Sequence, residues 1–98
     1  MATFILLTKL STHSLGDPHK RETVGRKWMK AVTSKCPEIK WLDHFALLGP
    51  FDFMDIYEAP DMEVAAKVSM ITMAQGAVKA ETWGALPYKR FLAVSKGL

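Results

Sequence analysis

Cysteine is almost absent from this sequence of 98 residues, in which Cys36 is the single one. One cysteine cannot close an intramolecular disulfide, whereas a small secreted domain ordinarily carries several pairs. Long apolar runs are missing too, because the opening stretch is uninterrupted only from Phe4 to Leu7 and follows no basic segment. That stretch is too short for a signal peptide or a membrane span. We therefore expect a cytoplasmic protein with no membrane partner.

Motifs that hold ions and nucleotides are equally scarce. The sequence has no glycine-rich phosphate loop and no cysteine and histidine spacing of the kind that binds zinc. We therefore expect neither a metal ion nor a cofactor. The composition argues against disorder, because hydrophobic residues make up 49% of the chain and charged residues 23%. A chain of this length is expected to form one domain, residues 1–98.

Charge is distributed unevenly along the chain. Residues 18–40 contain seven lysine and arginine residues against two glutamates, whereas residues 41–63 contain six acidic residues and no lysine or arginine. Such a separation gives the folded protein oppositely charged regions, which bears on the partners that it can bind.

The hydrophobic pattern predicts alternating strands and helices. Residues 3–10 form a strand-compatible apolar run, and Asp17-Pro18 is a start signal for a helix that ends before Pro37. The remaining predicted elements are a hairpin of residues 38–48 and 51–58 around Gly49-Pro50, a helix from Pro60-Asp61 to Gly76, a strand over 77–86 and a short C-terminal helix over 87–96. This order predicts an α+β fold, a ferredoxin-like βαββαβ sandwich whose four-stranded antiparallel sheet carries two helices on one face.

The first predicted strand is apolar on both of its faces. Phe4 and Leu6 alternate with Ile5 and Leu7, although both helices of such a sandwich lie on the same side of the sheet. A large exposed apolar sheet face is rare in monomers. The simplest cover is a second copy of the chain, so we expect a homodimer or higher homo-oligomer, with a ligand groove as the competing cover.

A histidine and an aspartate are predicted to face each other across the hairpin. With Gly49-Pro50 as a central two-residue turn, Leu48 lies opposite Phe51, His44 opposite Asp55, and Leu42 opposite Tyr57. A carboxylate orients an imidazole and raises its basicity, which is how a catalytic base is built. The same pair also fits a structural cross-strand contact worth about 0.2–1 kcal/mol, and a register slip by one residue would separate the two side chains.

Neighbouring side chains complete the candidate site. We expect Trp41, Phe53 and Tyr57 to line a groove between the sheet and the helices, where they bind a ligand that the catalytic pair His44 and Asp55 acts on. Asp52 is a further candidate ligand contact. An aspartate directly after a turn also commonly accepts backbone hydrogen bonds, so a role in locking the turn is the alternative.

The hairpin and its flanks resemble a known family. The residues that carry the resemblance are Leu48-Gly49-Pro50-Phe51-Asp52-Phe53, Ile56-Tyr57-Glu58-Ala59-Pro60-Asp61, Gln75-Gly76 and Glu81-Thr82. This pattern is similar to that of the GYD domain family, although Phe51 replaces the tyrosine of the family name. The resemblance implies a ferredoxin-like fold of the dimeric α+β barrel type, in a family of small proteins without an established general function.

Three functions are compatible with these observations. The first is a homo-oligomeric α+β barrel protein that binds or transforms a small molecule in a groove on the sheet, by fold analogy without a cofactor. The second is a structural or regulatory self-associating module. The third is RNA binding, since residues 51–56 loosely resemble the aromatic strand of RNA recognition motifs. That strand lies in the acidic segment, however, so we expect no nucleic acid partner.

Overall fold

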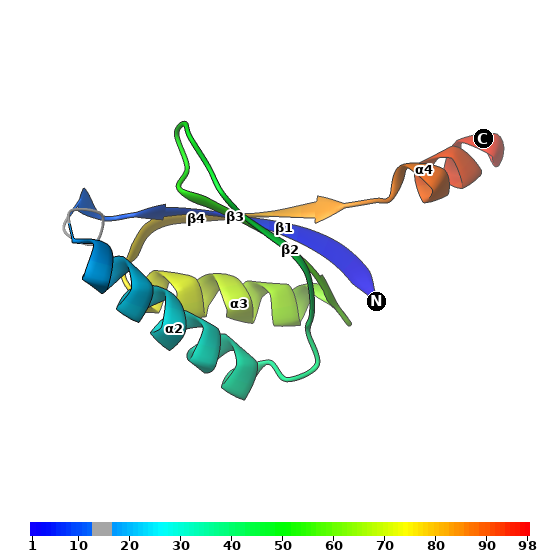
Figure 1. Ribbon diagram of the computed structural model, residues 1–98. Coiled ribbons are helices and arrows are strands. Elements are labelled where there is room, and N and C mark those ends of the chain that lie inside the picture. The colour runs from blue at the N-terminus through cyan, green and yellow to red at the C-terminus, as the bar shows by residue number, and fades with distance from the viewer. Residues whose placement is uncertain (13–16) are drawn as a thin grey trace.

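The computed structural model describes residues 1–12 and 17–98. Their elements are β1 (Ala2–Leu10), α2 (Pro18–Lys35), β2 (Lys40–Ala46), β3 (Phe53–Ala59), α3 (Met62–Ala74), β4 (Ala77–Ala85) and α4 (Tyr88–Lys96). The strands form one antiparallel sheet in the order β2-β3-β1-β4. Helices α2 and α3 cover one face of it (Figure 1). The predicted ferredoxin-like fold, with its additional C-terminal helix, is confirmed.

The helix boundaries follow from local signals in the sequence. The Asp17 carboxylate accepts a hydrogen bond from the amide of His19 at 2.9 Å, and Pro18 is the first residue of α2. The Asp61 carboxylate accepts one from the amide of Val64, also at 2.9 Å, and so caps α3. Helix α3 is followed by Gly76 at φ 103°, a left-handed conformation that favours glycine.

Strand β1 is apolar on both faces, as the sequence predicts. Leu6 is fully buried beneath the helices, whereas Leu7, on the opposite face, has an exposed fraction of only 6% within one chain. The main core lies between the sheet, α2 and α3; its buried members are Phe4, Leu6, Val32, Cys36, Tyr57, Ala59, Ala65, Val68 and Ile71. The face that carries Leu7 has no helix over it in the described residues (Figure 1).

The predicted two-residue turn at Gly49-Pro50 is wrong. Residues 47–52 connect β2 to β3, and Leu48 is fully exposed instead of facing Phe51. Pro50 has no amide hydrogen, so the ladder of the hairpin cannot continue through it. The chain is instead drawn toward the end of β1, because the amide of Asp52 donates to the carbonyl of Thr8 at 2.8 Å.

The register of the hairpin is confirmed at its centre and shifted at one end. His44 lies opposite Asp55, as predicted, but Trp41 and not Leu42 lies opposite Tyr57. Leu42 is the additional residue of an irregularity between Trp41 and Asp43 and is substantially exposed. The larger Trp41 ring takes the core position, where it packs on Tyr57 at a centroid distance of 5.5 Å.

Helix α4 lies apart from the rest of the molecule. It continues beyond the end of β4, clear of α2 and α3 (Figure 1), and none of its residues is buried. The radius of gyration is accordingly 14.7 Å, against about 13 Å for a compact chain of this length. Across the described ranges, 1–12 and 17–98, no helix has the length and apolar character needed to cross a membrane.

Candidate functional site

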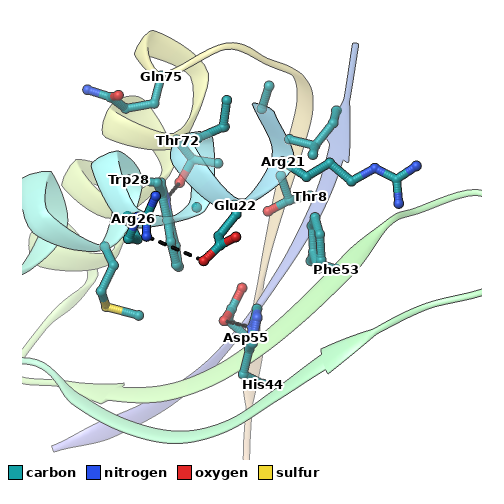
Figure 2. Close-up of a pocket in the computed structure, with 15 residues that line it drawn as sticks. Thr8, Arg21, Glu22, Arg26, Trp28, His44, Phe53, Asp55, Thr72 and Gln75 are labelled. Atoms are coloured by element: carbon teal, nitrogen blue, oxygen red, sulfur yellow. Dashed lines mark hydrogen bonds and ion pairs between the residues drawn. The ribbon is translucent and has the colours of Figure 1, made fainter. Parts of the chain in front are cut away.

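A cavity of about 350 Å³ lies between α2 and the sheet. Its walls come from the first half of α2, from β1 and β3, from His44 on β2 and from the end of α3 (Figure 2). The residues that line it are Thr8, Leu10, Arg21, Glu22, Val24, Gly25, Arg26, Trp28, Met29, His44, Phe53, Asp55, Thr72, Gln75 and Ala77. Most of this surface is apolar, so polar contacts to a bound molecule come from few places.

Trp28 fixes the position of α2 over the sheet. Its indole Nε1 donates a hydrogen bond to Oγ1 of Thr72 on α3 at 2.8 Å, and the Thr72 hydroxyl donates to the carbonyl of Val68 at 2.7 Å. Trp28 therefore spans the space between the two helices and forms one wall of the cavity (Figure 2). Gly25, about one turn earlier on α2, has no side chain. The space beside it is open, because no atom lies within 4 Å of the position that a Cβ would occupy.

The predicted pair of His44 and Asp55 forms the polar part of the sheet side of the cavity, whereas Glu22 and Arg26 are polar groups on the α2 side (Figure 2). His44 Nδ1 and Asp55 Oδ1 share a hydrogen bond (Figure 2). The His44 ring is largely exposed and stacks on Phe53 at a centroid distance of 5.7 Å, whereas Asp55 has an exposed fraction of 2%. Because Nδ1 is engaged by the carboxylate, Nε2 is the ring nitrogen available to a bound molecule.

The environment of Asp55 is unfavourable for its charge. Burial raises the pKa of the Asp55 carboxyl above its usual range, and the neighbouring His44 opposes that shift in part. A buried carboxylate whose contact is an imidazole holds that ring in one orientation and tautomer. The arrangement suits acceptance of a proton from a bound molecule at Nε2.

Two of the predicted ligand contacts, Tyr57 and Trp41, pack in or against the core and are not among the residues that line the main cavity. Centroid distances of 5.4–5.8 Å join four rings into one cluster, Phe4, Tyr57, Trp41 and Trp28. Tyr57 is fully buried, its hydroxyl has no hydrogen-bond partner, and burial raises its pKa to about 12. Trp41 lines a smaller hollow beside Met29, on which His44 and Asp55 also border. Phe53, by contrast, lines the main cavity.

Asp52 does not line the cavity either. Its carboxylate accepts a hydrogen bond from the amide of Leu10 at 2.8 Å, and its carbonyl accepts one from the amide of Leu47 at 2.8 Å. Asp52 thus ties the β2–β3 connection to the end of β1. Its contacts are those of a residue that holds a loop.

The contribution of α2 to the site is absent from the sequence-based prediction. Glu22, Gly25 and Met29 lie three and four residues apart, the spacing of one helical face, and all three line the cavity. Glu22 also forms an ion pair at 3.3 Å with Arg26, which lines the cavity as well, and both side chains are largely exposed (Figure 2). The sequence signal that could have revealed this wall of the cavity is Gly25 in the middle of a predicted helix. Glycine lowers helix stability, so its presence there indicates that a side chain would occupy space that the site uses.

Metal binding has no support in the described part of the chain, where no three histidine, cysteine, aspartate or glutamate side chains cluster closely enough to hold an ion. The cavity lining offers hydrogen bonding at His44 and Asp55 and charged groups at Glu22 and Arg26, inside a mostly apolar space.

Known proteins resemble this chain over nearly its full length. The glutamine synthetase and cystathionine beta-lyase binding protein of Thermus thermophilus is 26% identical over 97 residues, which cover 95% of this chain and 97% of that one. The structure of MtbAldR has a TM-score of 0.64 at 16% identity and covers 88% of this chain, which spans only 53% of MtbAldR. A crystal structure of a Thermus thermophilus protein has a TM-score of 0.57 at 18% identity, covering 89% and 95% of the two chains. The two structural likenesses show the fold alone.

The family model described as the GYD domain matches residues 4–94, from β1 into α4. The match includes the β2–β3 hairpin, on which the resemblance rests most strongly, and it includes His44 and Asp55. This chain belongs to the GYD domain family.

Proposed function

We propose that this protein is a binding module for a small, mostly apolar molecule, which occupies the cavity between α2 and the sheet. The observation that carries the proposal is the placement of the His44–Asp55 pair in the wall of an otherwise largely apolar cavity of about 350 Å³. Ligand sites in proteins are typically concave and apolar, with a small number of polar groups that orient the ligand. Their volumes range from about 300 Å³ upward.

The walls favour a flat molecule of one or two rings. Trp28 and Phe53 present aromatic surface from opposite sides, one from α2 and one from β3 (Figure 2). Aromatic rings gain about 0.5–1.5 kcal/mol from stacked or edge contacts in addition to burial. A hydroxyl or an acidic C–H on such a molecule would meet Nε2 of His44.

The same contact permits proton transfer. A proton that leaves the bound molecule would pass to Nε2 of His44, while the hydrogen bond between Nδ1 and Asp55 stabilises the resulting imidazolium. The step requires no oxidant, metal ion or cofactor, because it moves only a proton. The cavity and its apolar walls support the binding of such a molecule directly.

Titration of the ¹⁵N-labelled protein with 2-naphthol, a flat apolar phenol, tests the proposal. We expect saturable amide shifts in the first half of α2 and around Phe53. The affinity should be about two- to tenfold lower in His44→Ala, since one hydrogen bond is worth about 0.5–1.5 kcal/mol. Shifts confined to the face of the sheet that α2 and α3 leave uncovered would contradict a cavity site.

A second role in self-association is favoured by that uncovered face, which we call the open face. The register places on it Thr3, Ile5, Leu7, Lys9, Lys40, Asp43, Phe45, Met54, Ile56, Glu58, Lys79, Glu81, Trp83 and Ala85. Its two central strands contribute the apolar residues Ile5, Leu7, Met54 and Ile56. Phe45 and Trp83, on the two edge strands, are about half exposed. We propose that a second copy covers this face. The name of the Thermus thermophilus relative, a binding protein for two enzymes, supports a binding or regulatory role of this kind.

A further inference from the structure

We propose that the site under α2 is extended, and that it takes an elongated apolar molecule whose one polar group lies in its middle. In this arrangement Met29 is the movable wall between the main cavity and the smaller hollow beside it. The inference rests on the ligand site proposed above. It adds to that site the shape of the ligand and a residue that selects for its length.

Two spaces meet at the His44–Asp55 pair. The main cavity has a volume of about 350 Å³, and the smaller hollow, between α2 and β2, has a volume of about 230 Å³. The residues that line the smaller hollow are Met29, Trp41, Leu42, Asp43, His44 and Asp55. Three of these side chains, Met29, His44 and Asp55, also line the main cavity and therefore form the boundary between the two spaces. We call this boundary the junction.

The junction is not a closed end of the site. His44 and Asp55 lie away from Gln75, which lines the main cavity at the end of α3 (Figure 2). Beyond the pair, the smaller hollow continues with Trp41 and Leu42, which do not line the main cavity. A molecule that fills both spaces therefore has the His44–Asp55 pair beside its middle.

Met29 is the side chain of the junction that can move. Asp55 has an exposed fraction of 2%, and its hydrogen bond holds His44, whose ring also stacks on Phe53. Met29 has an exposed fraction of 37%, and its side chain is unbranched with three rotatable bonds. Rotation of Met29 would join the two spaces without disturbing the pair.

The walls on both sides of the junction are largely apolar. The main cavity presents Trp28 and Phe53, and the smaller hollow presents Trp41 and Leu42. Burial of apolar surface contributes to binding in proportion to its area, so an apolar group is favoured on each side. Asp43 also lines the smaller hollow, and its carboxylate disfavours an anionic group there.

A 1,3-diketone with an aromatic ring on each side has the required shape. Its central C–H is acidic, because the electron pair that remains after loss of the proton is delocalised over two carbonyl oxygens. At the junction this C–H would meet Nε2 of His44, which accepts the proton and leaves the enolate. The two rings would lie in the main cavity and in the smaller hollow.

Two diketones that differ in one arm test the length of the site. Dibenzoylmethane has a phenyl ring on both sides of its central carbon, whereas benzoylacetone has a phenyl ring on one side and a methyl group on the other. We expect isothermal titration of the wild type to give a Kd about tenfold lower for dibenzoylmethane, because its second ring buries apolar surface in the smaller hollow. Equal Kd values for the two molecules would overturn the inference.

Three variants identify the residues that determine this preference, measured as the ratio of the two Kd values. Met29→Ala removes the movable wall and the cost of reorienting it, so the preference should rise about threefold or more. Leu42→Trp fills the smaller hollow, so the preference should fall below about threefold. Met73→Ala makes the same change as Met29→Ala at a methionine of α3 that lines neither space, and it should leave the preference unchanged.

The three variants are expected to fold. Met29, Leu42 and Met73 have exposed fractions of 37–45%, and substitutions at exposed positions usually change stability little. A preference that keeps its wild-type value in both Met29→Ala and Leu42→Trp overturns the role of the smaller hollow. A preference that changes equally in Met29→Ala and Met73→Ala overturns the role of Met29.

The place of each ring is tested by NMR of the dibenzoylmethane complex. With the valine and leucine methyl groups ¹³C-labelled, we expect NOEs from the phenyl protons to Val24, in the main cavity, and to Leu42, in the smaller hollow. NOEs to Val24 without any to Leu42 would overturn the extended site.

This inference and the proposed function can fail separately. Absence of binding by both diketones and by 2-naphthol would overturn the cavity site and its extension together. Binding of 2-naphthol and of both diketones, with equal Kd values for the diketones, would overturn the extension alone. A preference for dibenzoylmethane that Leu42→Trp removes and Met73→Ala retains is the result that the extended site predicts.

Discussion

At the scale of single residues, Asp55 is the most constrained group in the site. The sequence predicts that Asp55 lies opposite His44, because the numbers of paired residues have a constant sum along a regular antiparallel hairpin. The structure confirms this pairing. Its burial could not be predicted from the sequence, since it depends on how closely α2 packs over the centre of the sheet. The sequence predicts Tyr57 as a ligand contact, whereas the structure places its side chain fully buried in the core.

The raised pKa of Asp55 predicts a pH-dependent loss of stability. The folded state binds the Asp55 proton more tightly than the unfolded state, whose pKa is near the ordinary value of 3.8. Below the unfolded pKa, Asp55 is protonated in both states and its ionisation does not affect the free energy of unfolding. As the pH rises from the unfolded pKa to the folded pKa, the free energy of unfolding falls progressively. Urea unfolding of the wild type and Asp55→Asn across this range should show the wild type losing stability relative to the variant.

Asparagine keeps an oxygen that accepts a hydrogen bond from His44, so the comparison isolates the charge of Asp55. A stability difference that stays constant with pH would contradict the raised pKa. A wild type that gains stability relative to Asp55→Asn as the pH rises would show a shift of the opposite sign.

The bond from Trp28 to Thr72 provides a second prediction at this scale. Thr72→Val removes the acceptor and leaves the indole Nε1 without its partner, and an unsatisfied buried donor costs about 1–3 kcal/mol. Trp28→Phe removes the donor as well, so the double variant should be less destabilised than the two single variants together. Chemical denaturation of all four proteins measures the coupling. Strict additivity would mean that the hydrogen bond contributes nothing.

At the scale of elements, the strands and helices follow from local patterns, and the connection between β2 and β3 does not. Capping aspartates, Pro18 and the glycine after α3 are local signals, and the helices begin and end close to where these signals indicate. The length of the 47–52 connection depends instead on long-range hydrogen bonds to β1, which no local signal reveals. The shift at Trp41 likewise reflects a choice between two side chains for one place in the core.

Asp52 is predicted to stabilise that connection. Asp52→Ala removes the acceptor of the Leu10 amide, and hydrogen bonds to charged groups are worth about 1.5–3 kcal/mol. Asp52→Asn retains an oxygen acceptor and should lose less. Equilibrium unfolding in urea compares the two variants. If both variants had the same free energy of unfolding as the wild type, the hydrogen bond from Leu10 to Asp52 would not stabilise the connection.

Two glycines are predicted to respond oppositely to alanine. Gly76 adopts φ 103°, so Gly76→Ala should destabilise the protein by about 1–2 kcal/mol. Gly25 lies inside α2 with open space around its Cβ position, so Gly25→Ala should stabilise it by about 0.5–1 kcal/mol. Thermal unfolding distinguishes the two. Destabilisation by Gly25→Ala would indicate a closer contact at this position than the structure places there.

At the scale of the whole molecule, the fold determines where the charged segments and the apolar surface lie. The sheet face opposite α2 and α3 and the helix α4 are exposed, and the basic segment 18–40 lies mainly in α2, which packs beside the strands β2 and β3 of the acidic segment 41–63 (Figure 1). The positions of the charged segments and of the exposed apolar surface can be predicted from the sequence once the fold is known. The cavity cannot be predicted in this way, because its volume depends on the separation between α2 and the sheet. Trp28 and its contact with α3 determine that separation.

The central claim is that the cavity under α2 binds a small molecule, and a variant that fills the cavity tests it most directly. Gly25→Leu places a side chain into open space at the cavity wall and replaces glycine with a better helix former, so the fold should not suffer. Isothermal titration with 2-naphthol should show one site per chain in the wild type and no detectable binding in Gly25→Leu, whose melting temperature should be at least that of the wild type. Equal binding by the two proteins would contradict the account.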